Sequence, residues 1–427
     1  MNKRVLIISP YFPPTNAADM QRVRMSLPYF SKFGWDAEIV TVDLRYSEMT
    51  KDELLMQSVP EGTIIHRVKA FNKGWTSKFG LGSIALRSLW FYRKVVNQIL
   101  KKSHFDLVYF STTQFPVCIL GAYWKKRFGT PYVIDMQDPW HSDYYRDKPK
   151  EQQPPKYWFS YRLNKYLEPK AMLHVDGLIS VSEAYIEDLK SRYPVLKNIP
   201  AETITFGAFA PDLEIAKKNE SAFKTLLDPG YTNVVYTGRG GADMHKAINV
   251  LFRVFKKGLD AEPGIFKKIR LYFIGTSYAP AGQGKPTVVP LAEQYGIENS
   301  VIEITGRISY YHALISLQHA DALFIPGSDD PNYTASKIHP YILVNKPLLA
   351  IFNPKSPAMG VLEEYGVKHV FDYDAPEDDA IYHFLKSLVQ GRMKADHYSE
   401  AAIKKYSAEN MTGRQCALFD KVVNGKN

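Results

Sequence analysis

Short apolar runs alternate with longer amphipathic segments along the first half of the chain. Continuous runs of β-branched and aliphatic residues predict strands buried on both faces, and they occur at residues 5–9, 37–42, 107–111, 132–135 and 177–181. Apolar positions at helical spacing lie between them, over residues 22–33, 86–101 and 183–192. This alternation predicts a parallel sheet with helices on both faces.

A second series of the same kind follows. Strands are predicted at residues 233–237, 270–275, 301–305, 322–326 and 347–352, with helices such as 247–255 and 311–319 between them. Residues 206–223 lose the strand pattern and gain charge, so we expect a linker over residues 206–230 and a second domain over 231–404. Two Rossmann-like domains in tandem would bind ligands at the carboxyl ends of their strands.

The composition fits a folded protein of two domains. A chain of 427 residues exceeds the size at which one core usually stops growing, and its two cysteines, Cys118 and Cys416, exclude a disulfide framework or a cysteine-based zinc site. No apolar stretch approaches the ~20 residues of a membrane span. The first apolar run is broken by Pro10, which favours a strand over a signal peptide. We therefore expect a cytoplasmic protein.

The formal net charge of +10 points to an anionic partner. The chain lacks zinc-finger spacing, an RNA-binding aromatic signature and a helix-turn-helix pattern, so nucleic acid is not expected. A phosphorylated substrate and an anionic membrane face remain, beside the alternative that the charge is only a solvated basic surface.

The stretch VVYTGRGGADMHKAINVLF, residues 234–252, is a candidate phosphate site. A strand runs into Gly238, Arg239, Gly240 and Gly241, and a helix follows from about Met244. Glycines let the backbone approach a phosphate, and a helix N-terminus offers unpaired N–H groups. Arg239 and Lys246 would add positive charge. The alternative is a glycine turn with two solvated cations.

The stretch TASKIHPYILVNKPLLA, residues 334–350, has a similar pattern, in which polar and cationic residues stand at a predicted helix N-terminus. Thr334 or Ser336 can cap a helix that begins near Lys337. Pro340 then stands in the first turn, where a missing N–H costs little. Ser336, Lys337 and His339 would cluster at the mouth of the sheet. An anion site and an ordinary capped helix both account for this pattern.

In their order and spacing, these motifs resemble those of the GT-B glycosyltransferases, specifically the retaining bacterial enzymes that build polysaccharides and glycolipids. The similar stretches are VLIISPYFPP, FGWDAEIVTVD, PYVIDMQDPW, VDGLISVSEAYIEDL, VVYTGRGG, VIEITGRISYYHALISLQHADALFIP and SKIHPYILVNKPLLA. The resemblance covers nearly the whole chain and implies two Rossmann-like domains that face each other across a cleft. Residues 397–423 resemble the family's last helix, so the N-terminal domain would comprise residues 1–205 plus 405–427.

The resemblance implies a nucleotide-diphosphate-sugar donor in the C-terminal domain and an acceptor in the N-terminal domain. Arg239 matches the family's diphosphate-binding arginine, and Lys246 is a match for its lysine partner. Gly238, Ser336 and Lys337 complete the expected donor site, with Asn332 and His339.

The sequence departs from the family in two places. Asn16-Ala17-Ala18 stands where the family usually has two glycines that face the diphosphate. The family's pair of glutamates is missing, and Asn332 and Pro340 occupy the two positions. Asn332 can bond a sugar hydroxyl, but Pro340 cannot hold the nucleotide ribose. Asp329, Asp330 and His339 are candidate substitutes.

Transfer in such a site needs no protein nucleophile, because the departing diphosphate can accept the acceptor's proton on the same face. No metal or other cofactor is expected, since Asp-x-Asp does not occur and Asp329-Asp330 has no evident further ligands. Asp138 and His141, which follow a predicted strand, are the candidate catalytic groups of the N-terminal domain. Alternatively, Asp138 caps the turn before Pro139.

Two stretches, residues 71–102 and 146–170, mix aromatic and basic residues in a way that suits a membrane surface. Residues 84–100 also fit an ordinary core-facing helix. The sequence thus predicts a cytoplasmic glycosyltransferase, at the inner face of the membrane, that moves a sugar to a glycan or lipid-linked acceptor in synthesis of a cell-surface polysaccharide such as lipopolysaccharide, with retention. The alternatives are a catalytically silent nucleotide-sugar-binding protein, favoured by the missing glutamates, and a nucleotide-sugar epimerase.

Overall fold

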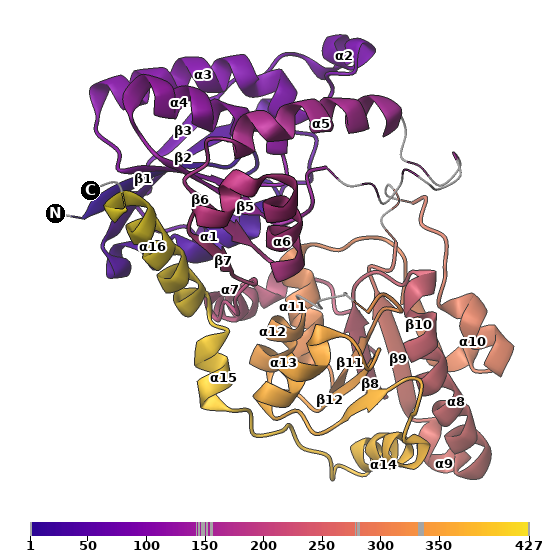
Figure 1. Ribbon diagram of the computed structural model, residues 1–427. Helices are drawn as coiled ribbons and strands as arrows, with labels where there is room; N and C mark the ends of the chain where they lie inside the picture. Colours follow the sequence, from indigo (N-terminus) through magenta and orange to yellow (C-terminus); the bar gives the residue numbers. More distant parts are fainter. Residues whose placement is uncertain are drawn as a thin grey trace. The chain divides into compact units, whose positions relative to one another are not determined.

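The computed structural model describes residues 2–141, 157–277, 282–331 and 337–425, together with residues 143, 146, 150, 153 and 279. The chain forms two compact units. The first comprises Met1–Gly207 with Ser407–Asn427, and the second comprises Ala208–Tyr406. Figure 1 shows that each unit has its own sheet with helices packed on it. No helix among the described residues is long and apolar enough to cross a membrane.

The first domain is built on a parallel sheet of seven strands in the order β3-β2-β1-β4-β5-β6-β7. Its strands are β1 Lys3–Ile8, β2 Trp35–Val42, β3 Ile65–Val68, β4 Leu107–Ser111, β5 Tyr132–Met136, β6 Gly177–Ser180 and β7 Ala201–Thr203. The chain reverses its direction of progress across the sheet between β1 and β4, which pair with Val5 beside Leu107. In open sheets of this kind, ligands bind at the carboxyl ends of the strands at such a switch point.

Helices cover both faces of this sheet. They are α1 Gln21–Ser26, α2 Lys73–Thr76, α3 Ile84–Lys102, α4 Ile119–Phe128, α5 Tyr157–Met172, α6 Glu183–Arg192 and α16 Ala408–Asn424, with short 3-10 helices η1 Ala18–Met20, η2 Phe30–Phe33, η5 Ser77–Phe79 and η8 Pro194–Asn198. The helix predicted over residues 22–33 is wrong in extent. Here α1 ends at Ser26 and η2 follows, because Pro28 lacks an N–H and cannot continue an α-helix.

The last helix, α16, belongs to the first domain although it is the end of the chain. Its Phe419 ring lies 5.4 Å from the Trp35 ring and 4.9 Å from the Tyr109 ring. Gln415 donates to Ser26 Oγ at 2.9 Å.

Val5 and Ile7 face one side of β1 and Leu6 and Ile8 the other, and all four are fully buried. This explains why β1 is apolar throughout.

The second domain has a parallel sheet of six strands in the order β10-β9-β8-β11-β12-β13. The strands are β8 Thr232–Thr237, β9 Ile269–Ile274, β10 Val301–Ile304, β11 Ala322–Pro326, β12 Leu348–Phe352 and β13 Val370–Asp372. The helices are α7 Pro211–Lys218, α8 His245–Ala261, α9 Pro263–Phe266, α10 Val289–Tyr295, α11 Tyr310–His319, α12 Ile338–Val344, α13 Pro357–Tyr365, α14 Asp378–Val389 and α15 Glu400–Lys405. Its switch point lies between β8 and β11.

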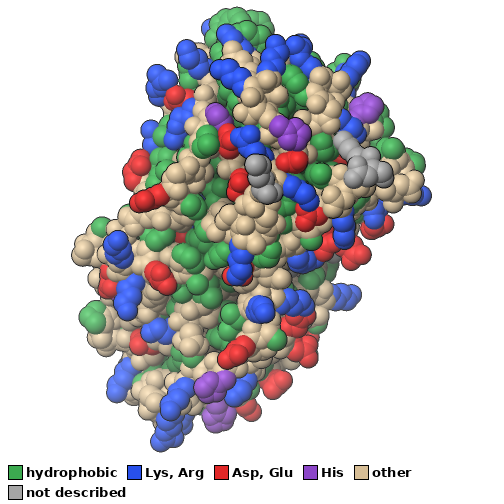
Figure 2. All heavy atoms as spheres, turned by 90° about the vertical axis from the view of Figure 1, so that its left-hand side faces the viewer, with side chains coloured by type: hydrophobic (Ala, Val, Ile, Leu, Met, Phe, Trp, Pro, Cys, Tyr) green, Lys and Arg blue, Asp and Glu red, His purple; other side chains and the backbone are tan. Residues whose placement is uncertain are grey.

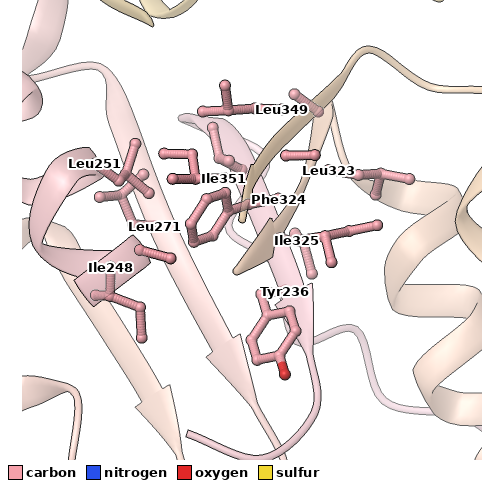
Figure 3. Packing of buried hydrophobic residues seen from close by; sticks show 14 of the residues in the cluster. Tyr236, Ile248, Leu251, Leu271, Leu323, Phe324, Ile325, Leu349 and Ile351 are labelled. Carbon is pink, nitrogen blue, oxygen red and sulfur yellow. The ribbon is translucent and has the colours of Figure 1, made fainter. Parts of the chain in front are cut away.

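Side chains from the central strands and from α8 form the core of the second domain (Figure 3). Ile248 and Leu251 of α8 pack towards Leu271 of β9, and Phe324 of β11 lies in the middle of the cluster. Tyr236 is the penultimate residue of β8. Its hydroxyl points away from this cluster and donates to the carbonyl oxygen of Arg239 at 2.9 Å. The core therefore extends directly into the loop that follows β8.

Three strands lack a sequence signal, and all three are short edge or near-edge strands. β3, β7 and β13 each have mixed or partial burial, so no apolar run marks them. Residues 206–230, expected to be a linker, instead contain α7. Asp212 of α7 accepts hydrogen bonds from the hydroxyls of Tyr310 and Tyr311, so this segment is tied to the second domain.

A fully buried ion pair joins α1 to the centre of the first sheet. Arg22 Nε lies 2.7 Å from Asp135 Oδ2, and neither side chain has any exposure. Arg22 also donates to the carbonyl oxygen of Ile204 at 2.7 Å. Asp135 accepts further from Ser111 at 2.9 Å and from Gln137 at 2.9 Å. The pair thus links α1, β4, β5 and the end of β7.

We expect Asp135→Ala to lower the free energy of unfolding by about 3–5 kcal/mol, because it leaves the Arg22 charge buried without a counter-charge. Chemical denaturation of wild type and variant measures this difference. Glu187→Ala is the control, since Glu187 forms an exposed pair with Lys190 and should change stability by less than about 1 kcal/mol. Equal effects of the two substitutions would contradict the central role of the buried pair.

Candidate functional site

The loops at the switch point of the second sheet carry a group of charged side chains. Arg239 and Asp243 follow β8, Ser328 and Asp329 follow β11, and Lys337 stands at the start of α12. Arg307 follows β10. The carboxyl ends of these parallel strands meet at one edge of the sheet, so the topology brings together residues that are far apart in sequence.

The glycines after β8 are required by packing. Gly238 has a φ of 154°, and a Cβ on it would lie 1.9 Å from Lys337 Nζ and 2.5 Å from the Tyr236 hydroxyl. A Cβ on Gly240 would lie 3.0 Å from Thr276 and Val288 side-chain atoms. The N–H groups of Gly238 and Gly240 donate to the carbonyl oxygens of Ile274 and Thr276. These two N–H groups are therefore engaged within the protein, and Gly238 makes room for the Lys337 ammonium group.

Arg239 forms a two-pronged ion pair with Asp243. Both nitrogen–oxygen distances are 2.6 Å. Ser328 also donates to Asp243 Oδ2 at 2.6 Å, and the Asp329 N–H donates to the Asp243 carbonyl at 2.7 Å. The hydrogen bonds from Arg239 and Ser328 lower the pKa of Asp243 against the opposing effect of burial. Asp243 thereby orients the guanidinium group and ties the loop after β8 to the loop after β11.

Lys337 is the second cation of this group. Its ammonium nitrogen lies 5.5 Å from the centre of the Tyr236 ring and directly beside Gly238. Burial, together with the positive charges of Arg239 and Arg307, lowers the pKa of Lys337 to about 8. Among the described residues no carboxylate forms an ion pair with Lys337. A partly buried ammonium group beside two guanidinium groups is suited to an anionic ligand, whose charge would relieve the repulsion.

His339 does not join this cluster. It is 6% exposed, its Nδ1 lies 2.9 Å from the Tyr365 hydroxyl, and its ring stacks on Tyr406. Burial lowers its pKa to about 4, so the ring is neutral at neutral pH. Residues two positions apart in a helical turn point to different faces, which is why Lys337 faces the site and His339 faces the core.

Lys246 is also placed elsewhere. It is an exposed residue in the first turn of α8, and its ammonium nitrogen lies 5.2 Å from the centre of the Tyr373 ring, which follows β13. Lys337, predicted as part of the helix start, is the lysine that the fold brings beside Arg239. Asn332 and Ser336 lie outside the described residues. Within the part of the chain that the structure describes, no group of three or more His, Cys, Asp or Glu side chains is arranged to hold a metal ion.

Glu303, which was not predicted as a site residue, stabilises one side of the glycine loop after β8. Glu303 of β10 accepts from the backbone N–H groups of Val288 and Val289 at 3.0 and 2.8 Å, at the start of α10. It also accepts from the Thr276 hydroxyl at 2.6 Å, while the Thr287 hydroxyl donates to Gly240 O at 2.5 Å. Glu303 thus holds the α10 N-terminus against the glycine loop. Both Glu303 and Arg307 stand in the stretch VIEITGRIS. The position after a strand could have marked Arg307, and the presence of a carboxylate within a predicted strand could have marked Glu303.

In the first domain, Asp19 ties together the loops at the switch point. It is buried in η1, and its carboxylate accepts from the Thr112 hydroxyl at 2.8 Å and the Thr113 N–H at 3.1 Å. Gln137 donates to the Asp19 carbonyl at 3.1 Å. Burial raises the pKa of Asp19, and these hydrogen bonds oppose that effect. The loops after β1, β4 and β5 are thereby joined.

Asp138 and His141 line different cavities, which share Pro139 and Trp140 as walls. Asp138 reaches solvent beside a cavity of about 400 Å³, where partial burial and the nearby Asp19 carboxylate raise its pKa. His141 lines a second cavity of about 400 Å³ with Glu168 and Arg192. Burial lowers the pKa of His141, and its ring packs on Tyr161. Asp138, not His141, therefore adjoins the loops that Asp19 joins.

Comparison with known proteins agrees with this architecture. Residues 45–205 match the model of Glycosyltransferase Family 4. Sucrose-phosphate synthase from Thermosynechococcus elongatus is 12% identical with a TM-score of 0.59, and the match covers 99% of this chain and 100% of that chain. The chain has the GT-B fold, and residues 45–205 are similar to Glycosyltransferase Family 4.

Two further structures are similar to this chain over nearly its full length. HepE from Anabaena, solved with UDP and glucose, is 13% identical with a TM-score of 0.56, and the match covers 98% and 100% of the two chains. The lipopolysaccharide outer core galactosyltransferase WaaB is 12% identical with a TM-score of 0.52, and the match covers 99% and 100%. A comparison with curated protein sequences finds no match. The prediction of two Rossmann-like domains is confirmed, and the family match of residues 45–205 agrees with the prediction of a glycosyltransferase.

The buried His339 should make the protein sensitive to acid. Its pKa is about 4 in the folded state, against about 6.5 for an unperturbed histidine. Between these values the unfolded chain binds the extra proton, so the free energy of unfolding should fall by about 3 kcal/mol as the pH drops from 7 to 4. In His339→Phe, this part of the pH dependence should disappear. Denaturation curves at several pH values measure it, with the exposed His104→Asn as control. If the free energy of unfolding of His339→Phe depends on pH as that of the wild type does, the pH dependence does not come from His339.

Proposed function

We propose that the protein transfers a sugar from a nucleotide-diphosphate-sugar to a glycan or lipid-linked acceptor. The observation that carries this proposal is the group of Arg239, Lys337 and Arg307 at the switch point of the second sheet. Asp243 forms an ion pair with Arg239, whereas Lys337 forms none with a carboxylate among the described residues, so the Lys337 charge is available to a diphosphate. The neighbours HepE, solved with UDP and glucose, and WaaB, a galactosyltransferase, support a donor of this class.

In this proposal the diphosphate of the donor binds between Arg239 and Lys337. Arg239 can offer its fork of N–H groups to phosphate oxygens, and Lys337 can act as a point charge. Binding would also remove the repulsion that lowers the pKa of Lys337. We assign Lys337, in place of Lys246, as the lysine of the donor site. Gly238 contributes by leaving space for the ammonium group.

The same cations would stabilise the departing group. As the bond between the anomeric carbon and the diphosphate oxygen breaks, negative charge grows on that oxygen, and the acceptor oxygen forms the new bond to the carbon. The acceptor's proton can pass to the departing diphosphate on the same face, which gives retention. Fixed charges in a partly desolvated site contribute most when they are already oriented, as Asp243 orients Arg239.

On the acceptor side we propose Asp138. Its carboxylate stands at the carboxyl end of β5 and lines a cavity large enough for part of a sugar or a lipid headgroup. Its role is to bind and orient the acceptor hydroxyl, and the Asp19 network holds the loop that carries it. His141 lines the adjoining cavity and is a candidate for contacts farther along the acceptor.

We place the activity in the synthesis of a cell-surface polysaccharide or lipopolysaccharide at the cytoplasmic face of the membrane. WaaB, a lipopolysaccharide galactosyltransferase of similar structure, supports this role. Cys118 and Cys416 are free and buried, which suits a reducing compartment.

A second candidate is a catalytically silent nucleotide-sugar-binding protein. One observation favours it: Pro340 stands in α12 where the resemblance expects a ribose-binding glutamate, and His339, a candidate substitute, is buried against Tyr365 and Tyr406. Turnover of a labelled nucleotide-sugar separates the two. Transfer or hydrolysis supports the enzyme, whereas binding without turnover supports the silent protein.

A thermal-shift screen with UDP, GDP, ADP, TDP and CMP tests the donor site. One nucleoside diphosphate at ~100 times its dissociation constant should stabilise the protein by ~2.7 kcal/mol. Arg239→Ala should abolish the shift because it removes the forked donor and leaves Asp243 to repel the phosphate. Arg253→Ala, on the exposed part of α8, is the control and should keep the shift. If no nucleotide shifts the wild type, the proposed function is wrong.

The affinity for that nucleotide should depend on pH through Lys337. With a free-state pKa of about 8, the lysine is mostly charged at pH 7 and mostly neutral at pH 9. The diphosphate needs the charged form, so its dissociation constant should rise by about tenfold between these pH values. Calorimetric titrations measure it. Lys337→Arg stays charged and should show little change, whereas a parallel pH dependence in that variant would assign the effect to another group.

A further inference from the structure

One groove of the first domain has mainly apolar walls. Its volume is about 400 Å³, and η5, α3, η6 (Phe115–Cys118) and α5 contribute to its lining. Phe115 and Trp140 stack at 5.5 Å between ring centres, and Leu86, Phe159 and Leu163 complete the apolar part. Asp138, the proposed acceptor-binding carboxylate, lines the same groove.

Exposed aromatic side chains flank this groove. Gly80 and Phe159 line it, and their sequence neighbours Phe79 and Trp158 are 64% and 65% exposed. Trp75 of α2 is 62% exposed, and its ring lies 5.6 Å from that of Phe79. A Cβ on Gly80 would lie 2.7 Å from Phe159 Cε1, so η5 and the start of α5 are in close contact. The exposed rings of the two segments therefore belong to one surface, which we call the aromatic rim.

Basic residues surround the aromatic rim, and acidic ones are missing from its segments. Residues 69–103 contain eight Lys and Arg and no Asp or Glu, and residues 157–167 add Arg162 and Lys165 without an acid. Arg87 is buried and Lys73 pairs with Glu48. Lys94 lies over the ring of the exposed Trp90, and Arg162 lies over the ring of Trp158. Figure 2 shows a different face of the molecule, where Lys and Arg side chains also stand among hydrophobic ones along the upper edge.

We propose that the aromatic rim of Trp75, Phe79 and Trp158 docks on an anionic lipid bilayer, so that the groove and Asp138 open at the lipid–water interface. Tryptophan and phenylalanine insert favourably into the headgroup region, and each Lys or Arg near an anionic leaflet adds electrostatic attraction. The inference deepens the proposed function and rests on it for its purpose: a lipid-linked acceptor would enter the groove from the bilayer, with its sugar hydroxyl at Asp138.

The chemistry of the rim favours a bilayer over a protein partner. Protein interfaces are depleted in lysine, and their cores bring aromatic residues together in one packed patch. Here the exposed rings of the rim belong to two segments, α2 with η5 and the start of α5, and cations lie over the rings of Trp158 and of the nearby Trp90. Such an arrangement suits a surface that is negatively charged, deformable and apolar just beneath its headgroups.

Co-sedimentation of the full chain with vesicles tests the proposal. We expect binding to vesicles of phosphatidylcholine with phosphatidylglycerol, weak binding to phosphatidylcholine alone, and weakening by salt. The triple variant Trp75→Ala/Phe79→Ala/Trp158→Ala should bind the anionic vesicles about tenfold more weakly or worse, because it removes the inserted area. All three side chains are exposed, so the fold should be preserved.

The matched control is Val195→Ala, which truncates another exposed apolar side chain, on η8 beside the opposite edge of the sheet. It should bind vesicles as the wild type does. Lys78→Glu/Lys94→Glu should weaken binding to anionic vesicles while the rings remain. Failure of the wild type to bind anionic vesicles, or equal binding by the triple variant, overturns the proposal.

The vesicle-binding test of the docking surface can fail independently of the nucleotide-binding test of the proposed function. The nucleotide thermal shift depends on the second domain and should be the same in the triple variant and the wild type. A nucleotide shift without vesicle binding rejects only the docking surface. Vesicle binding without any nucleotide shift rejects the proposed function and leaves the docking surface in place.

Discussion

The buried pair of Arg22 and Asp135 joins the segments from which the acceptor side of the first domain is built. Asp135 is the penultimate residue of β5, and Arg22 lies in α1, directly after the η1 turn that carries Asp19. Since neither charge reaches water, each depends on the other and on the hydrogen bonds around them. Gln137 connects this pair to Asp19, and Asp138 is the next residue in the chain. The position of the proposed acceptor carboxylate therefore follows from an interaction that is itself inaccessible to any substrate.

In the second domain, by contrast, the charged side chains of the candidate site must remain available to a ligand. Asp243 binds Arg239 through both of its oxygens and also binds Ser328, so the arginine is held without being buried. Lys337 has no such carboxylate among the described residues, and its environment disfavours its own charge. One cation is thus oriented in advance, and the other is stabilised by the anion that it binds.

The two domains also differ in what lies beyond the site. Around the groove of the first domain, aromatic rings and cations are exposed together. The inner face of α3 packs normally, because Tyr92 and Val96 are fully buried and Arg87 donates to backbone carbonyls. Residues 84–100 thus form both an ordinary core-facing helix and part of a basic surface, so the two interpretations that its pattern allowed are compatible.

The sequence by itself determined the two parallel sheets, because strands buried on both faces must be apolar throughout, and the central strands of both sheets show this pattern. It could not reveal β3, β7 and β13, whose edge positions leave them partly polar. It marked Arg239 and Lys337 as site residues, but it pointed to Lys246 as the partner of the arginine, whereas the structure brings Lys337 beside it. That placement depends on strand order, which brings the start of α12 beside the loop after β8. Likewise, only the tertiary structure showed that Lys337 faces the candidate site while His339 is buried, and that Asp138 and His141 line different cavities. Residues that are close in sequence can point to opposite faces within one turn of the backbone.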